Sequence, residues 1–299
     1  MIEISVVLCS YNRIASLEKV LLSLTDQTLP ADQFEVVVVD DGSTDGTSQR
    51  VQSLDLPYRL VLRTQANQGL ATARNTGIMA ASGWVVLFID DDVLADRRLL
   101  AEHLRSHFKH PKAVVNGWVN HVETPVRPEK RRFTMADIST SFFWTSNVSV
   151  KREHLLAAGL FDEEFKEYGW EDQELGLRLM ALGLQARNNY KAVGYHVKSP
   201  PQTTDVQGML RQAEAKARTA LLYIKKHPRL RSRFATGIHP PRLAVYRMST
   251  VGGLLEKFCR SQLELDRGDP NGKRPLNPLQ KWCARELATI HYFRTISQG

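Results

Sequence analysis

The N-terminal third of the sequence alternates short apolar runs with helical patterns, and this alternation constrains the fold more than any other feature. Four apolar runs rich in β-branched residues predict buried strands: Ile4 to Cys9, Phe34 to Val39, Tyr58 to Leu62 and Trp84 to Ile89. Ile14 to Leu24 carries apolar residues at helical spacing, and Leu70 to Ala81 is a small-residue helix. Such a β-α-β succession requires right-handed crossovers and helices on both faces of the sheet. We therefore predict an α/β fold with a mainly parallel sheet sandwiched by helices.

The fourth apolar run ends abruptly in three carboxylates, Asp90, Asp91 and Asp92. Adjacent acids repel one another, and a fold tolerates them readily only beside a cation or hydrogen-bond donors. Ligands of open α/β sheets bind just beyond the carboxyl ends of strands. Asp90 and Asp92, one residue apart, therefore suit a hard divalent ion such as Mg²⁺ or Mn²⁺. A solvated acidic turn is the alternative at this point.

Polar loops follow the other predicted strands. Tyr11 offers a ring on which a base can stack, and Arg13 offers positive charge to a phosphate. Asp41 is a hydrogen-bond acceptor for a base edge, and Arg74 lies on the helix after the third strand. A nucleoside diphosphate bridged by a metal to the acidic loop would use all four residues. Ordinary turn and capping chemistry explains each of them separately.

Two other phosphate-binding loops are absent from the sequence. The residues after the first strand, Ser10 to Arg13, do not form the Gly-x-Gly-x-x-Gly pattern of dinucleotide-binding folds, and no Walker loop is present. Three widely spaced cysteines give neither a disulfide framework nor a zinc pattern.

The middle of the chain carries a second polar cluster. Phe142 to Val150 alternates apolar and small polar residues, which predicts a half-buried strand. Its Thr145, Ser146 and Asn147 either face a ligand or serve ordinary strand hydrogen bonding. From Glu171 onward the apolar spacing predicts a helix. A capping role explains at most one of the two acids at its start, Glu171 and Asp172.

The C-terminal part reads as helical, so we divide the chain into residues 1–205, a catalytic domain, and residues 206–299, a helical extension. Helical patterns cover Met209 to Lys226, Leu243 to Leu265 and Leu279 to Ile296. Packing on the catalytic domain is one role for these helices. Basic residues beside aromatic ones also suit peripheral membrane or homo-oligomer contacts. Lys198 to Asp205, which contains Pro200 and Pro201, is predicted to be a lid over the ligand.

The formal net charge is +8, and no apolar stretch approaches the roughly 20 residues of a membrane span. The chain starts a strand pattern almost at once and lacks a basic leader. We therefore expect a cytoplasmic protein, with attachment to the inner membrane face left open. No nucleic-acid partner is expected.

Four segments in order resemble the motifs of family 2 inverting glycosyltransferases, which have the GT-A fold and use nucleotide-diphosphate sugars: Ser5 to Arg13, Asp40 to Asp45, Asn67 to Asn75 and Phe88 to Asp92. The resemblance covers roughly residues 1–200. It implies that Asp41 recognises the base and that Ser10, Tyr11, Arg13 and Arg74 surround the nucleotide. It also implies that Asp90 and Asp92 bind ribose and metal, whereas Asp91 touches the sugar or nothing.

Tyr168 to Leu179 resembles the Trp-Gly-Gly-Glu-Asp and Gly-Trp-Glu-Asp motifs of inverting GT-A enzymes. The match implies Asp172 as catalytic base, Glu171 orienting the acceptor hydroxyl, and Trp170 packing on the acceptor. The roles of Glu171 and Asp172 are interchangeable at this point. By the same resemblance His196, 24 residues after Asp172, is the third metal ligand beside Asp90 and Asp92, although a lone histidine usually has a structural role.

These observations predict an inverting glycosyltransferase that depends on Mn²⁺ or Mg²⁺ and belongs to the hexosyl- or N-acetylhexosaminyltransferase class. A UDP-sugar is the favoured donor, and the acceptor is a carbohydrate, lipid-linked or other hydroxyl. The rival outside catalysis is a silent nucleotide-sugar-binding or scaffold protein of the same fold. A nucleotidyltransferase would carry a Gly-rich basic N-terminal loop, which is absent.

Overall fold

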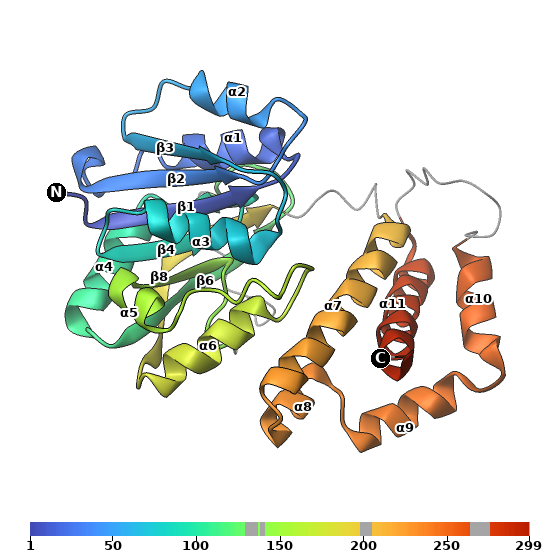
Figure 1. The fold of residues 1–299 in the computed structure, drawn as a ribbon. Coiled ribbons are helices and arrows are strands. Elements are labelled where there is room, and N and C mark those ends of the chain that lie inside the picture. The colour runs from blue at the N-terminus through green and yellow to red at the C-terminus, as the bar shows by residue number, and fades with distance from the viewer. Residues whose placement is uncertain (129–136, 138–140, 198–204, 264–275, 299) are drawn as a thin grey trace. The chain divides into compact units, whose positions relative to one another are not determined.

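The computed structural model describes residues 1–128, 137, 141–197, 205–263 and 276–298. The chain divides into two compact units (Figure 1). The sheet unit comprises Met1–Lys166 and Glu171–Lys198, and the helical unit comprises Glu167–Trp170 and Ser199–Gly299. The predicted lid falls on residues 198–205, of which 198–204 lie outside the described residues.

The described part of the sheet unit contains one eight-stranded sheet with the order β3-β2-β1-β4-β7-β6-β8-β5. Its strands are β1 (Ile4–Ser10), β2 (Phe34–Asp40), β3 (Arg59–Thr64), β4 (Val85–Ile89), β5 (Val93–Ala95), β6 (Ala113–Val122), β7 (Asn147–Lys151) and β8 (Gln185–Val197). The first four strands of this order are parallel. β7 runs antiparallel to both of its neighbours, and β5 runs antiparallel to β8. The parallel half therefore extends into a mixed half.

Helices cover both faces of the sheet (Figure 1). They are α1 (Ile14–Ser23), α2 (Thr47–Gln52), α3 (Leu70–Ala80), α4 (Leu99–Lys109), α5 (Arg152–Ala157) and α6 (Glu171–Ala181), with a 3₁₀ turn η1 (Ala31–Gln33). Along β1, Val6 and Leu8 pack on the face that α1 and α4 cover, whereas Val7 packs on the face of α3 and α6. Successive strand residues point to opposite faces, so a strand buried on both sides must be apolar throughout. The predicted layered α/β fold is confirmed.

One predicted strand is partly wrong. The alternation from Phe142 to Val150 predicts a single strand, but β7 begins only at Asn147. The backbone N–H of Asn147 donates to the carbonyl of Trp144 at 3.2 Å, so the chain turns before it enters the sheet. Alternation of small and apolar residues does not distinguish a strand from a turn that buries one aromatic ring, here Phe143.

The helical unit contains α7 (Val206–Lys226), α8 (Leu230–Thr236), α9 (Pro240–Ser249), α10 (Leu254–Gln262) and α11 (Pro278–Gln298), with a 3₁₀ turn η4 (Val251–Gly253). The long helices α7 and α11 lie side by side (Figure 1). Their buried residues include Leu210 and Leu287, which pack with Cys259 of α10. Gly252 and Gly253 adopt positive φ, which ends the helical pattern between α9 and α10. Among the described residues, no helix is both long and apolar enough to cross a membrane.

Candidate active site

The three aspartates of the loop between β4 and β5 have different sets of partners, of which Arg13 is shared by two. Asp91 is buried, accepts a hydrogen bond from Ser10 Oγ at 2.7 Å, and contacts Arg13 at 2.9 Å. Arg13 also reaches Asp92 Oδ2 at 2.7 Å. Burial raises the pKa of Asp91 to about 6, although Arg13 and Ser10 oppose the shift. The acidic loop is therefore folded around a cation, as its like charges require.

Asp92 faces His196 because β5 and β8 pair in register immediately beyond the acidic loop. Val93 lies opposite His196, and the backbone N–H of Val197 donates to the carbonyl of Asp92 at 2.9 Å. His196 Nε2 is 3.4 Å from Asp92 Oδ1. Asp92 Oδ1 and His196 Nδ1 are both buried without a hydrogen-bond partner among the described residues. The predicted proximity of Asp92 and His196 is therefore present in the structure.

The pair formed by Asp92 and His196 fits a divalent ion. One ion with bonds of about 2.1 Å to Nε2 and to a carboxylate oxygen spans a separation of this size, and a diphosphate and water commonly supply its remaining ligands. Asp90, the other predicted ligand, instead accepts a hydrogen bond from Ser146 Oγ at 2.5 Å. Among the described residues, no group of three or more His, Cys, Asp or Glu side chains is placed to hold a metal.

Arg74 links the acidic loop to the start of α6. Arg74 is only 5% exposed, and its guanidinium donates to Glu171 Oε1 at 2.8 Å and to Thr145 Oγ1 at 2.7 Å. The same guanidinium lies 4.0 Å from Asp90. Glu171 Oε2 is buried and has no hydrogen-bond partner in the described part of the chain. Arg74 thus gathers carboxylates from two elements that are far apart in sequence.

Asp172 lies in the first turn of α6, next to this network. Burial and the neighbouring Glu171 raise its pKa to about 7, while Arg74 opposes the shift. Its Oδ1 accepts a hydrogen bond from the backbone N–H of Gln173 at 2.7 Å. Asp172 is half-buried. A carboxylate whose pKa lies near neutrality can exchange a proton at the pH where most enzymes work.

Asp41 holds the loop that precedes α3. Its two carboxylate oxygens accept hydrogen bonds from Gln65 Nε2 at 2.8 Å and from the backbone N–H groups of Gln68 and Gly69 at 3.0 Å each. Gly69 has a φ of +90°, and a Cβ at this position would lie 2.7 Å from the carbonyl oxygen of Lys166. Glycine is therefore required where this loop approaches the chain so closely.

The remaining predicted residues lie at the edge of the site or outside the sheet unit. Tyr11 is 48% exposed, so its ring is available to a ligand. Trp170 belongs to the helical unit, where its indole stacks on Tyr223 with ring centroids 5.4 Å apart. Its Nε1 donates to the carbonyl of Lys216 at 3.1 Å. The role of Trp170 toward an acceptor stays a prediction.

Sequence alone does not decide whether Thr145, Ser146 and Asn147 face a ligand or serve strand structure. Thr145 and Ser146 bind Arg74 and Asp90, whereas Asn147 is committed to the fold through the carbonyls of Trp118 and Ala192. Gln65 is a further site residue that no sequence pattern indicates. Its partner Asp41 lies on another strand end, so only the pairing of β2 with β3 brings the two together.

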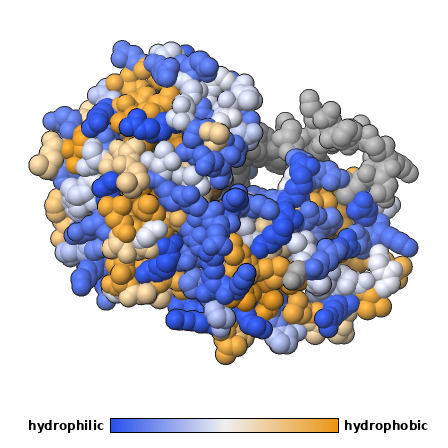
Figure 2. All heavy atoms as spheres, in the orientation of Figure 1, coloured by the Kyte–Doolittle hydropathy of each residue, from blue (hydrophilic) through white to orange (hydrophobic). Residues whose placement is uncertain are grey.

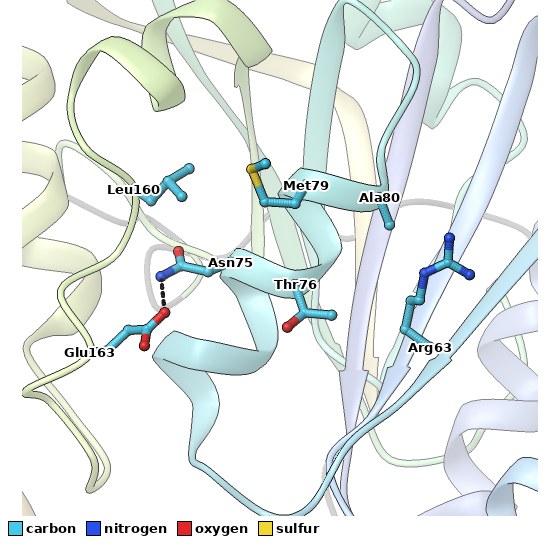
Figure 3. A pocket seen from close by; sticks show the side chains of 7 residues that line it. All are labelled: Arg63, Asn75, Thr76, Met79, Ala80, Leu160 and Glu163. Carbon is cyan, nitrogen blue, oxygen red and sulfur yellow. Dashed lines mark hydrogen bonds between the residues drawn. The ribbon is translucent and has the colours of Figure 1, made fainter.

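A surface pocket of about 490 Å³ lies on α3 (Figure 3). None of the predicted site residues lines it; its walls are Arg63, Asn75, Thr76, Met79, Ala80, Leu160 and Glu163. Asn75 points across it and donates to Glu163 at 2.9 Å, as the dashed line in Figure 3 marks. Asn75 also bonds both backbone groups of Phe161, so we read it as a support for that loop.

Solved structures of known proteins share this fold. A mannosyltransferase from Pyrobaculum calidifontis in complex with GDP-Man and Mn²⁺ is 22% identical with a TM-score of 0.62, and the match covers 99% of this chain and 86% of that chain. Residues 1–349 of Staphylococcus aureus TarS in complex with UDP-GlcNAc are 20% identical with a TM-score of 0.59, and the match covers 99% and 91% of the two chains. The fold is therefore that of GT-A glycosyltransferases.

Sequence comparison extends the likeness to curated proteins. The glycosyltransferase YfnE of Bacillus subtilis is 30% identical over 68% of this chain and 66% of its own length. The validoxylamine A glucosyltransferase of Streptomyces hygroscopicus subsp. jinggangensis is 31% identical over 76% of this chain and 61% of its own length. The chain thus spans less than two thirds of the length of both relatives. The family model described as glycosyl transferase family 2 matches residues 5–161, and the chain belongs to that family.

Proposed function

We propose that this protein is an inverting, metal-dependent glycosyltransferase that moves a sugar from a nucleotide-diphosphate donor to a hydroxyl group. The observation that carries the proposal is the buried guanidinium of Arg74. It lies 4.0 Å from Asp90 on the proposed donor side and 2.8 Å from Glu171 on the proposed acceptor side. In this proposal the sheet unit is the catalytic unit, and residues 206–299 are a helical extension.

Asp172 is the proposed catalytic base, in preference to Glu171. Glu171 is committed to Arg74 at 2.8 Å, and its negative charge is one cause of the raised pKa of Asp172. A base with a pKa near 7 is ionised for a large part of the time at neutral pH and still holds a proton well once it has accepted one. Glu171 then acts as a positioning residue for Asp172 and for the acceptor hydroxyl.

The reaction is a single displacement at the anomeric carbon of the donor sugar. The acceptor oxygen forms a bond to this carbon while its proton passes to Asp172, and the bond between the carbon and the diphosphate oxygen breaks. The electron pair of that bond leaves with the nucleoside diphosphate. Because attack and departure occur on opposite faces of the sugar, the configuration inverts. A carboxylate base within hydrogen-bond reach contributes about 10²–10⁴-fold to such a step.

Asp92 and His196 are the proposed protein ligands of the divalent ion, which when bound supplies positive charge that stabilises the leaving diphosphate. Asp90, with Ser146 as its donor, is then assigned to the ribose or sugar hydroxyls rather than to the metal. Asp41 is assigned to the base edge. Its carboxylate already accepts three hydrogen bonds and has about four acceptor positions, which leaves room for one more donor.

The donor is proposed to be a hexose or N-acetylhexosamine attached to UDP, with GDP as the alternative nucleotide. The related solved structures contain GDP-Man with Mn²⁺ in one case and UDP-GlcNAc in the other. Tyr11, with its ring half exposed, and the neighbouring Arg13 are the residues proposed to meet the nucleotide. A carbohydrate or lipid-linked hydroxyl is the proposed acceptor.

Calorimetric titration of the whole protein with UDP and GDP, with and without Mn²⁺, tests the donor side. We expect one nucleotide to bind more tightly when Mn²⁺ is present, and Asp92→Asn to abolish the gain. Asp26→Asn, an exposed carboxylate that pairs with Arg127, is the matched control and should bind as the wild type does. Absence of metal-dependent binding by both nucleotides and by the remaining nucleoside diphosphates would refute the donor assignment.

A screen of nucleotide sugars for slow donor hydrolysis identifies the sugar in the same preparation. Turnover of one donor above that of the Asp172→Asn variant would support catalysis. Tight, metal-dependent binding of a donor that is neither hydrolysed nor transferred to any acceptor class would instead favour the silent nucleotide-sugar-binding protein.

A further inference from the structure

The segment from Lys225 to Arg260 concentrates the positive charge of the chain. It holds nine Lys or Arg residues against a single acid, Glu256, so its net charge of +8 equals the formal net charge of the whole protein. Arg233, Arg247 and Lys257 are exposed, and no carboxylate of the described residues lies within salt-bridge distance of them. This part of the helical unit therefore presents unneutralised positive charge to its surroundings.

The same segment exposes large apolar side chains. Seven of them are between 45% and 77% exposed: Leu230, Phe234, Val245, Met248, Val251, Leu254 and Phe258. Single exposed apolar residues are common on protein surfaces, but a gathering of seven within three short helices and the turn η4 between the last two is not. We call α8 to α10, with these residues and the basic ones among them, the basic-apolar surface.

These exposed residues are not the ones that hold the helical unit together. Tyr246 of α9 packs on Phe293 of α11 with ring centroids 5.2 Å apart, and Cys259 and Leu255 of α10 join the core of α7 and α11. Val245 and Met248 lie on another face of α9 and remain exposed. The helices thus have an apolar face for the core and further apolar residues outside it.

The exposed apolar residues recur at helical spacing. Within α9, Val245 and Met248 are three residues apart, and within α10, Leu254 and Phe258 are four residues apart, whereas Val251 lies in the turn η4 between the two helices. Residues three or four apart lie on the same side of a helix. Arg247 directly precedes Met248 in the sequence, and Lys257 directly precedes Phe258. Figure 2 shows hydrophobic and hydrophilic surface lying side by side over this helical region.

We propose that the basic-apolar surface docks the protein on an anionic lipid bilayer, with α8 to α10 lying in the plane of the membrane interface. An interfacial helix of this kind buries aliphatic and aromatic side chains at the headgroup boundary, while Lys and Arg meet anionic lipid. Helices α8 to α10 carry both the exposed basic side chains and the exposed apolar side chains that such docking requires. An anionic bilayer would thus bury the exposed apolar side chains and neutralise the exposed positive charge at the same time.

Two other occupants satisfy only part of the surface. A second copy of this chain, related by two-fold symmetry, would place the same positively charged patch against itself, which costs energy through repulsion of like charges. A nucleic acid would neutralise the Lys and Arg side chains through its phosphates, but its backbone offers no burial to Met248 or Leu254.

Flotation of the whole protein with vesicles tests the proposal. We expect binding to vesicles in which part of the phosphatidylcholine is replaced by phosphatidylglycerol, weaker binding at high salt, and little binding to pure phosphatidylcholine. The charge variant Arg233→Glu, Arg247→Glu, Lys257→Glu should lower the partition coefficient strongly, since each basic residue near an anionic surface contributes about fivefold. The apolar variant Met248→Ser, Leu254→Ser should lower it at least about tenfold.

Matched variants in the sheet unit keep the test specific. Arg63→Glu, Arg98→Glu, Lys112→Glu makes the same change in net charge, and Met79→Ser alters a side chain that is 58% exposed. Both controls should float as the wild type does. All of these positions are exposed, so circular dichroism should show the same fold for every variant.

Several results would overturn the proposal. Equal binding to neutral and anionic vesicles, or no vesicle binding by the wild type, would exclude an anionic bilayer as the partner of this surface. So would variants of the basic-apolar surface that float like the wild type. Self-association in light scattering that Met248→Ser, Leu254→Ser abolishes, without vesicle binding, would assign the surface to a second copy. Binding to duplex DNA that outcompetes anionic vesicles would assign it to nucleic acid. None of these results depends on sugar transfer, so the proposed function is tested separately.

Discussion

The candidate active site and the basic-apolar surface use the same residue types in opposite ways. In the site, Arg74 is 5% exposed, and its guanidinium contacts a carboxylate, a hydroxyl and an aromatic ring within the sheet unit. On the surface, Arg233 and Arg247 are exposed beside apolar side chains. A buried cation fixes the geometry of its neighbours, whereas an exposed cation is free for a partner. Burial therefore decides whether a basic residue here organises the fold or meets another molecule.

Removing the buried cation should have the largest effect on stability. Arg74→Met leaves Glu171 buried without its partner, which costs about 3–5 kcal/mol in the free energy of unfolding. Arg218→Met, which breaks an exposed pair with Glu167 in the helical unit, should cost less than about 1 kcal/mol. Urea denaturation of both variants measures the difference. Equal losses would mean that burial does not distinguish the two regions.

The pH dependence of turnover should follow Asp172. Its pKa is raised to about 7, so the fraction of ionised base, and with it turnover, should fall about tenfold for each pH unit below this value. Above it turnover should reach a plateau. A profile measured with saturating donor and acceptor checks the prediction, and a plateau that extends down to pH 5 would contradict it.

The same shift predicts the direction of a stability change. The folded state holds the proton of Asp172 up to about pH 7, whereas an unfolded aspartate has a pKa of about 3.9. The contribution of Asp172 to the free energy of unfolding is therefore fully present below the unfolded pKa and is lost as the pH rises to the folded one. Comparing wild type and Asp172→Asn by denaturation across this range isolates the effect.

Metal-dependent binding should distinguish His196 from a histidine outside the site. His196→Gln removes a proposed ligand beside Asp92 and should weaken Mn²⁺-dependent nucleotide binding by about tenfold or more. His154→Gln, on α5, should leave it unchanged. Calorimetry with and without Mn²⁺ measures both. A wild-type affinity in His196→Gln would confine His196 to a structural role.

The smallest effect is expected on the basic-apolar surface in the absence of lipid. Leu254→Ser changes a side chain that is 74% exposed and should alter the free energy of unfolding by less than about 0.5 kcal/mol. Leu287→Ala, in the core of the same unit, should cost about 2–5 kcal/mol. A loss of similar size in Leu254→Ser would show that this residue supports the fold and is not spare.

Sequence patterns predicted the sheet unit well because local spacing reports burial directly. The apolar run of β1 alternates between two cores, and both demand the same residue types. The strand predicted from Phe142 was wrong because a turn that buries Phe143 has the same alternation. The spacing of apolar residues along the chain thus indicates which segments are buried, but it does not indicate whether a buried segment is a strand or a turn.

The candidate site depended on contacts that no local pattern reveals. Arg74 and Glu171 lie 97 residues apart, and Asp92 meets His196 through the register of β5 with β8. The family resemblance implies that Asp92 and His196 lie close together as metal ligands. It places Arg74 near the nucleotide, however, and does not indicate its contact with Glu171. That Trp170 and Glu171, adjacent in sequence, fall in different units was also beyond the sequence.

Asp172 is the proposed base of a glycosyl transfer whose donor is held on the side of the acidic loop. Measuring both nucleotide affinity and turnover in Asp172→Asn tests this role, because the substitution keeps the shape of the side chain while it removes the negative charge and the capacity to accept a proton. We expect unchanged metal-dependent nucleotide affinity and a turnover lowered by about 10²–10⁴-fold. Turnover close to that of the wild type would contradict it.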